Sequence, residues 1–219
     1  MKYTLESLIT HVEQSLINSD GNLSKLTQEI LDLEGYSGNK TRHLYNNICS
    51  LKGANYLEVG TWKGSSFISA IYKNEINAIA IDNWSEFDGP KEEFVSNVNK
   101  ITPDSKYNFI EKDAFEIEIS DFPESNSEID IYLYDGCHTY DCQKNGITHY
   151  YDFFSKYFIL MIDDWRDDEN WQQVSKGTWD GINEKGIIVH KHYKRTSFQE
   201  ITGRQDYWNG IGIFVCEKS

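Results

Sequence analysis

Residues 54–64 read Ala-Asn-Tyr-Leu-Glu-Val-Gly-Thr-Trp-Lys-Gly, and two serines follow at 65 and 66. An apolar run ends in an acid, Glu58, and glycines stand at 60 and 64 before a stretch typical of a helix. This order predicts a strand, a tight turn and the N-terminus of a helix. Glycine lets a ligand approach bare backbone, and the free N–H groups of the helix point toward that ligand. The segment therefore predicts a binding site that includes Glu58, Gly60, Gly64 and Ser65.

A second acid, Asp82, ends the next apolar run at 78–81 and lies 22 residues after Gly60. An acid about 20 residues past a glycine turn is where nucleoside-binding sheets accept hydrogen bonds from ribose hydroxyls. Asn83 and Trp84 stand at the same strand end. We therefore expect a nucleoside-containing cofactor at Asp82, Asn83 and Trp84. The Trp84 ring either stacks on that ligand or closes the top of the core.

Short apolar runs alternate with helical stretches from residue 53 onward, which is typical of a parallel sheet with helices on both faces. The expected strands are 55–59, 77–82, 107–111, 129–134 and 157–162, and the expected helices are 65–73, 91–100, 140–153 and about 170–184. Two further strands, at 187–189 and 210–215, have no clear helix between them and predict an antiparallel pair.

The chain is expected to form one domain, 1–219, with an α/β core at 53–219 and an N-terminal helical extension at 1–52. Apolar residues recur at helical spacing near 3–18, 26–31 and 44–51 in this extension. These helices either pad one edge of the sheet or cover the substrate.

The composition excludes several classes of partner. The chain has a formal net charge of −14, which repels phosphate backbones and anionic lipid, so neither nucleic acid nor a membrane is expected as a partner. The four cysteines form no C-x-x-C pair and are expected to be reduced thiols, as in a cytoplasmic protein. The first 20 residues show no signal-peptide core.

The pattern Glu-x-Gly-x-x-x-Gly-x-Ser over residues 58–66 resembles motif I of the class I S-adenosylmethionine-dependent methyltransferases. The resemblance implies S-adenosylmethionine as the cofactor. It also implies a Rossmann-like, doubly wound seven-stranded sheet in the order 3-2-1-4-5-7-6, with the last strand antiparallel. In that family an acid after the third strand binds the adenine amino group, and Asp113, followed by Ala114, stands there. The alternative is that Asp113 caps the short helix that follows.

A second resemblance lies after the fourth and fifth strands. The segment Asp135-Gly-Cys-His138-x-Tyr140, together with Asp163-Asp164, resembles the macrocin-type and sugar-modifying branch of small-molecule O-methyltransferases. In those relatives such acids hold a divalent metal, which implies Asp135, Asp163 and Asp164 as ligands. Mg²⁺ suits carboxylate and water oxygens. Adjacent acids on an extended chain point to opposite faces, so Asp163 and Asp164 both reach the ion only if the chain turns there. Alternatively, one of the pair caps the next helix or pairs with Arg166 or Lys156.

His138 is the candidate general base, because an imidazole accepts a proton near neutral pH. Asp135 stands at the same strand end and is expected to contribute to catalysis, to cofactor binding and to the metal site. The implied reaction is methylation of a small-molecule hydroxyl.

Two other functions compete with this interpretation. One is an NAD(P)-dependent oxidoreductase on a Rossmann sheet, which the missing third glycine and the acid Glu58 disfavour. The other is a non-catalytic protein that kept the cofactor fold as a binding surface. The sequence leaves open the identity of the methyl acceptor, and it leaves open whether the chain forms a homo-oligomer.

Overall fold

A computed structural model describes residues 2–123, 128–166, 172–197 and 206–219. Its centre is a seven-stranded sheet in the order β3-β2-β1-β4-β5-β7-β6. Strands β1 to β5 run parallel, and β7 is antiparallel to both of its neighbours. The predicted fold class, including the strand order and the antiparallel last strand, is confirmed.

The element bounds follow the sequence pattern closely in the core. The strands are β1 Asn55–Val59, β2 Asn77–Asp82, β3 Lys106–Glu111, β4 Ile129–Tyr134, β5 Phe154–Asp163, β6 Ile188–Arg195 and β7 Ile211–Glu217. The helices are α1 Leu5–Asp20, α2 Gln28–Leu31, α3 Asn39–Ile48, α4 Ser65–Ile71, α5 Lys91–Ile101, α6 Tyr140–Thr148 and α7 Gln172–Glu184. Short 3-10 turns stand at Ile119–Asp121 and Tyr151–Phe153.

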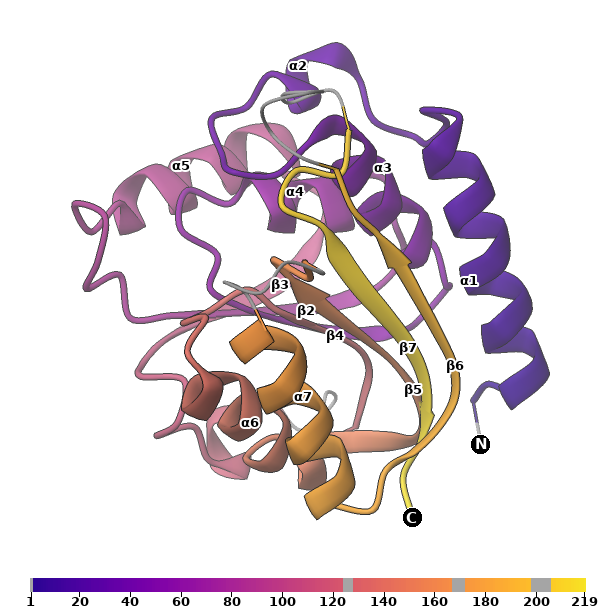
Figure 1. Ribbon diagram of the computed structural model, residues 1–219. Coiled ribbons are helices and arrows are strands. Elements are labelled where there is room, and N and C mark those ends of the chain that lie inside the picture. The colour runs from indigo at the N-terminus through magenta and orange to yellow at the C-terminus, as the bar shows by residue number, and fades with distance from the viewer. Residues whose placement is uncertain (1, 124–127, 167–171, 198–205) are drawn as a thin grey trace.

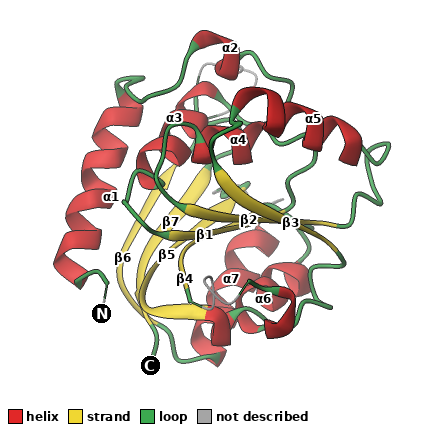
Figure 2. Ribbon diagram, turned by 180° about the vertical axis from the view of Figure 1, so that it is seen from behind, coloured by secondary structure: helices red, strands yellow, loops and turns green. Residues whose placement is uncertain are grey.

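Helices cover both faces of the sheet, as Figures 1 and 2 show. Helices α1, α3, α4 and α5 contribute to one buried apolar cluster, and α6 and α7 contribute to a second cluster on the opposite face. Alternate residues of each strand enter opposite clusters, because successive side chains of a strand point to opposite faces. In β1, Tyr56 enters the first cluster and Leu57 enters the second. Glu58 is two residues after Tyr56 and therefore faces α3 and α4.

The N-terminal extension packs against the core through α1 and α3. Helix α1 begins after Thr4, whose side chain accepts the N–H of Ser7 in a capping box. Helix α3 begins at Asn39, earlier than the apolar spacing at 44–51 predicts, because its first turn is built from polar residues. The described helices include none with the length and apolar character that a bilayer span requires.

The cysteine prediction needs one correction. Cys137 and Cys142 form a disulfide, with their Cα atoms 5.7 Å apart, while Cys49 and Cys216 are free and buried. Thr139 caps α6 with its side chain, and the turn into this helix brings residues 137 and 142 together. The two cysteines are five residues apart and flank the start of α6, so they do not form the C-x-x-C pattern on which the prediction depended. The pairing also removes part of the basis for expecting a cytoplasmic protein.

Candidate functional site

The turn after β1 is built on two glycines in the left-handed region. Gly60 has a φ of +86° and Gly64, which precedes α4, has a φ of +88°. The Gly60 N–H donates to the Ile81 carbonyl of β2. A Cβ on Gly60 would lie 2.1 Å from the Asp135 carbonyl oxygen. Only glycine can occupy this position. Because it has no side chain, the end of β1 can lie in contact with the end of β4.

Asp82 fixes this turn from the neighbouring strand. Its Oδ2 accepts the backbone N–H groups of Thr61 and Trp62, both at 2.9 Å, and its Oδ1 accepts the N–H of Trp84 at 2.7 Å. Carboxylate oxygens offer about four acceptor positions in all, so Asp82 retains room on Oδ1 for one ligand hydroxyl. The acid expected at the ribose therefore also holds the loop that would surround the ligand.

Glu58 is fully buried between the sheet and α4. The hydroxyls of Tyr56 and Ser66 donate to its two oxygens, each at 2.5 Å. Burial raises the pKa of the Glu58 carboxyl from 4.5 to about 7; these two hydrogen bonds oppose the shift, and the nearby Asp82 adds to it. An acid that is this costly to ionise is not explained by packing alone, which marks the position as a functional candidate.

Glu58 predicts a pH dependence of folding stability. Its pKa is higher in the folded state, so the folded state binds more protons between pH 4.5 and about 7, and stability falls as pH rises through this range. The shift corresponds to a loss of at most about 3 kcal/mol. We expect urea unfolding of Glu58→Gln to depend less on pH than the wild type does. Glu29→Gln, at an exposed acid of α2, is the control. Equal pH dependence in all three proteins would contradict the prediction.

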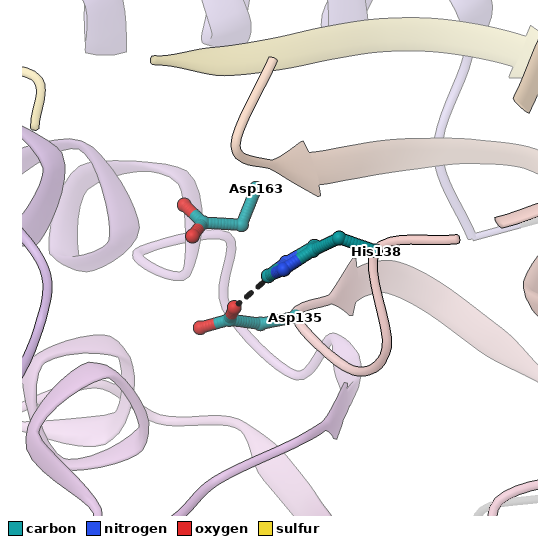
Figure 3. Close-up of side chains that lie close together, drawn as sticks. All are labelled: Asp135, His138 and Asp163. Atoms are coloured by element: carbon teal, nitrogen blue, oxygen red, sulfur yellow. Dashed lines mark ion pairs between the residues drawn. The ribbon is translucent and has the colours of Figure 1, made fainter. Parts of the chain in front are cut away.

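The ends of β4 and β5 bring together an acidic centre, shown in Figure 3. Asp135, His138 and Asp163 each offer one ligand atom, and these atoms lie within 4.8 Å of one another. The His138 Nε2 is 3.8 Å from an Asp135 oxygen, and its Nδ1 is 3.6 Å from an oxygen of Asp164. Asp164 has a φ of +54°, so the chain does turn between the two adjacent acids.

The electrostatics of this acidic centre favour a bound cation. Burial raises the pKa of Asp135 well above its ordinary value, and repulsion by Asp164 and Glu58 adds to the effect. Burial likewise raises the pKa of Asp163, with repulsion from Asp135 and Asp164. Like charges held close together in a partly buried site are stabilised by a metal ion or another cationic group. Two carboxylates and an imidazole are ordinary ligands for divalent metals.

Tyr45 is a member of this centre that the sequence analysis missed. It belongs to α3, its ring is fully buried, and its hydroxyl donates to Asp163 Oδ1 at 3.2 Å. Burial raises the pKa of the Tyr45 hydroxyl well above 10, and Asp163, Asp135 and Glu58 add to the shift. Tyr45 is therefore a neutral donor held against an acid. The N-terminal extension contributes to the centre as well as padding the sheet.

Asp113 and Ala114 lie at the end of β3, toward the α6 face of the sheet. The Asp113 Oδ1 accepts the N–H of Phe115, and the Ala114 carbonyl accepts the hydroxyl of Tyr150. Asp113 is exposed, and its charge contributes to the raised pKa values of Tyr134 and Tyr150. The structure therefore places Asp113 apart from the acidic centre.

Three other predicted cofactor residues have distinct surroundings. The Asn83 side chain accepts from the N–H and the hydroxyl of Ser85 in an exposed loop. The Trp84 ring is only 7% exposed, and its Nε1–H donates to the Trp62 carbonyl. Ser65 is buried, and a Cβ on Gly35 would meet its hydroxyl at 1.9 Å, so the backbone of the extension covers it.

Comparison with known proteins supports a methyltransferase assignment. Residues 57–165, just under half of the chain, match a family described as a methyltransferase domain. None of the curated proteins is similar enough in sequence to match. The matched segment contains Glu58, Asp82, Asp135 and Asp163 and excludes Tyr45.

Solved structures share the fold at low sequence identity. An O-methyltransferase from Bacillus cereus in complex with S-adenosylhomocysteine is 13% identical, with a TM-score of 0.58 over 94% of this chain and 90% of that chain. The O-methyltransferase TomG of tomaymycin synthesis from Streptomyces achromogenes, with S-adenosylmethionine bound, is 12% identical, with a TM-score of 0.58 over 94% and 89%. A proposed RNA methyltransferase from Pyrococcus horikoshii is 11% identical, with a TM-score of 0.56 over 95% and 98%. These likenesses concern the fold and leave the acceptor open.

Proposed function

We propose that this chain, an S-adenosylmethionine-dependent methyltransferase by its domain and fold, transfers the methyl group to a hydroxyl oxygen of a small molecule. One observation carries the proposal: the glycine turn held by Asp82 adjoins an acidic centre of Asp135, Asp163 and His138. Gly60 lies against the Asp135 carbonyl, so cofactor turn and acidic centre are neighbours at one rim of the sheet.

The cofactor would lie along this rim. The residues proposed to contact it are Glu58, Gly60, Gly64, Ser65, Asp82, Asn83, Trp84, Asp113, Ala114 and Asp135. Asp82 would accept a hydrogen bond from a ribose hydroxyl, and the buried Glu58 and half-buried Asp135 would balance the positive sulfonium.

The chemistry requires an acceptor oxygen that loses a proton. The oxygen attacks the methyl carbon as the carbon–sulfur bond breaks, and the sulfur leaves as a neutral thioether. His138 would take the hydroxyl proton, and Asp135 and Asp164 beside its ring would orient it for this transfer. The remaining acceleration would come from holding the two reactants in line.

Asp135 and Asp163 would hold a divalent cation such as Mg²⁺. The site suits a cation because two carboxylates converge there, and burial and repulsion between neighbouring acids raise their pKa values. A bound cation lowers the pKa of a hydroxyl that contacts it. Asp164 is the third predicted ligand, and its carboxylate lies 3.6 Å from His138 Nδ1. This position favours a role for Asp164 in orienting His138 rather than in binding the ion.

The charge of the chain favours a small acceptor over RNA. A net charge of −14 repels a phosphate backbone, and binding of nucleic acid is dominated by contacts between basic side chains and phosphates. The O-methyltransferase TomG of tomaymycin synthesis shares the fold, but so does the proposed RNA methyltransferase, so the acceptor is tested directly.

The experiment compares cofactors and acceptors on the purified protein. Calorimetry should detect binding of S-adenosylmethionine and not of NADH. Mass spectrometry should detect S-adenosylhomocysteine when hydroxylated small molecules, such as phenols and sugars, are added. Methyl transfer to RNA alone, or binding of NADH in place of S-adenosylmethionine, would overturn the proposal.

Asp82→Ala is the variant that tests the cofactor site. We expect at least a tenfold loss of affinity for S-adenosylhomocysteine, because a hydrogen bond to a charged group contributes about 1.5–3 kcal/mol. Asp88→Ala, in the exposed loop that follows β2, is the matched control and should bind normally. Unchanged affinity in a folded Asp82→Ala protein would show that the ribose assignment is wrong.

A further inference from the structure

Four aromatic rings from separate parts of the chain meet beside the cofactor turn. Tyr36 lies between α2 and α3, Trp62 in the turn after β1, Phe87 in the loop after β2, and Trp208 shortly before β7. The Tyr36 ring centroid is 4.9 Å from that of Trp62, 6.4 Å from that of Phe87 and 6.2 Å from that of Trp208. We call these four residues the aromatic platform.

Two rings of the platform are exposed, although a folded chain ordinarily buries such rings, and Trp62 and Trp208 are half-buried. Tyr36 is 61% exposed and Phe87 is 67% exposed. Trp84 attaches the loop that carries Phe87 to the core, because its ring is buried against Phe94 and Phe109. Phe87 is therefore not needed to attach this loop to the core. Large apolar side chains that gather on a surface mark a binding site.

Two platform residues adopt a backbone conformation that is unfavourable for bulky side chains. Trp62 has a φ of +45° and Phe87 has a φ of +50°. The left-handed region is uncommon for such residues and costs about 1–2 kcal/mol at each. Asp82 holds the Trp62 backbone, and the Trp62 Nε1–H donates to the Phe87 carbonyl. The fold thus maintains backbone strain at the half-buried Trp62 and the exposed Phe87, as functional sites do.

The platform lies on the same rim as the acidic centre. Trp62 is two residues beyond Gly60, which touches the Asp135 carbonyl. Trp208 is three residues before Ile211, which pairs with Asp163 across β7 and β5. The ends of β4 and β5 lie between the strands that carry these two tryptophans. A molecule stacked on the platform would have the acidic centre as its neighbour.

The charges around the platform disfavour an anionic ligand. Lys63 lies 4.8 Å from the centre of the Trp62 ring, but it is paired with Glu34 and Glu93, each at 3.0 Å. Glu86 and Asp88 flank Phe87 in the sequence and are exposed. Stacking surfaces for nucleic acid combine aromatic rings with a positively charged groove, whereas Lys63 and Lys40 beside these rings are each paired with an acid.

We propose that Tyr36, Trp62, Phe87 and Trp208 form the stacking site for a planar aromatic methyl acceptor that carries no negative charge. This inference rests on the proposed function, because it assigns the acceptor class of the same enzyme. Ring stacking supplies affinity through the flat faces of both partners, and the acceptor hydroxyl then projects toward Asp135 and His138.

The test measures binding to protein saturated with S-adenosylhomocysteine, so it needs no methyl transfer. The probes are naphthol, its saturated counterpart decahydronaphthol, glucose and a short oligoribonucleotide, and binding is measured by equilibrium dialysis. The variants are Tyr36→Ala and Phe87→Ala, and the matched control is Leu23→Ala, at a 62% exposed residue of the same extension. Because all three side chains are exposed, each variant should fold.

We expect naphthol to bind more tightly than decahydronaphthol, and to bind about tenfold more weakly to Tyr36→Ala and Phe87→Ala while Leu23→Ala matches the wild type. Affinity for S-adenosylhomocysteine should be the same in all four proteins. The proposal is overturned if naphthol does not bind, if both variants bind it normally, or if glucose or the oligoribonucleotide shows the platform dependence instead. Failure of the wild type to bind S-adenosylhomocysteine would count against the proposed function itself.

Discussion

Asp135→Asn should reduce methyl transfer by about a thousandfold and at the same time raise the melting temperature. The activity falls because the amide neither supports the His138 imidazolium nor holds a cation, and such roles contribute about 10²–10⁴-fold in rate. The stability rises because burial and repulsion by Asp164 and Glu58 raise the pKa of Asp135. Near neutral pH an acid with a raised pKa destabilises the folded state, and the amide relieves this cost.

These two opposite effects separate a functional defect from a folding defect. Rates are measured as S-adenosylhomocysteine formation, and stability by thermal unfolding near pH 8. Binding of Mn²⁺ as a Mg²⁺ substitute, followed by electron paramagnetic resonance, should also be lost in Asp135→Asn. Asp141→Asn, at an exposed acid in the first turn of α6, should leave all three measurements unchanged. Retention of more than a tenth of the wild-type rate would exclude Asp135 from catalysis.

Local patterns in the sequence were sufficient to predict the fold. Apolar runs at 55–59 and 77–82 correspond residue for residue to β1 and β2, since fully buried strands are continuous apolar segments bounded by turns. Strand β6 is longer than the predicted 187–189, because its later residues are charged and partly exposed at the sheet edge. The predicted helix at about 170–184 begins at Gln172 in the described residues, and 170–171 lie outside them.

The candidate site was predictable where its residues follow strands. Asp82, Asp135 and Asp163 each stand at the carboxyl end of a parallel strand, and topology alone brings such positions to one rim. Tyr45 carried no such signal, because it sits in a helix 118 residues from the acid that it contacts. Tyr36 likewise meets Trp62 only through tertiary packing. Contacts of this kind depend on how the N-terminal extension packs against the sheet. The spacing of apolar residues along the sequence does not predict that packing.

Gly60→Ala should destabilise the protein by several kcal/mol and abolish activity in whatever fraction still folds. The new Cβ would lie 2.1 Å from the Asp135 carbonyl oxygen, a backbone atom that cannot rotate away. The φ of +86° adds strain of about 1–2 kcal/mol for any residue with a Cβ. The only relief is a shift of β1 from β4, which would move Asp135 away from His138 and Asp163.

Gly21→Ala is the matched control, because its φ is −87° and its Cβ would meet no atom closer than 3.5 Å. Alanine at such a position is neutral or stabilises by about 0.4–1 kcal/mol, through the unfolded chain. Urea unfolding should therefore separate the two variants widely, although both add the same methyl group. If Gly60→Ala matched Gly21→Ala in stability and activity, the ends of β1 and β4 would not be in the contact described. The acidic centre would then lack its link to the cofactor turn, because the Gly60–Asp135 contact is what places these two features together.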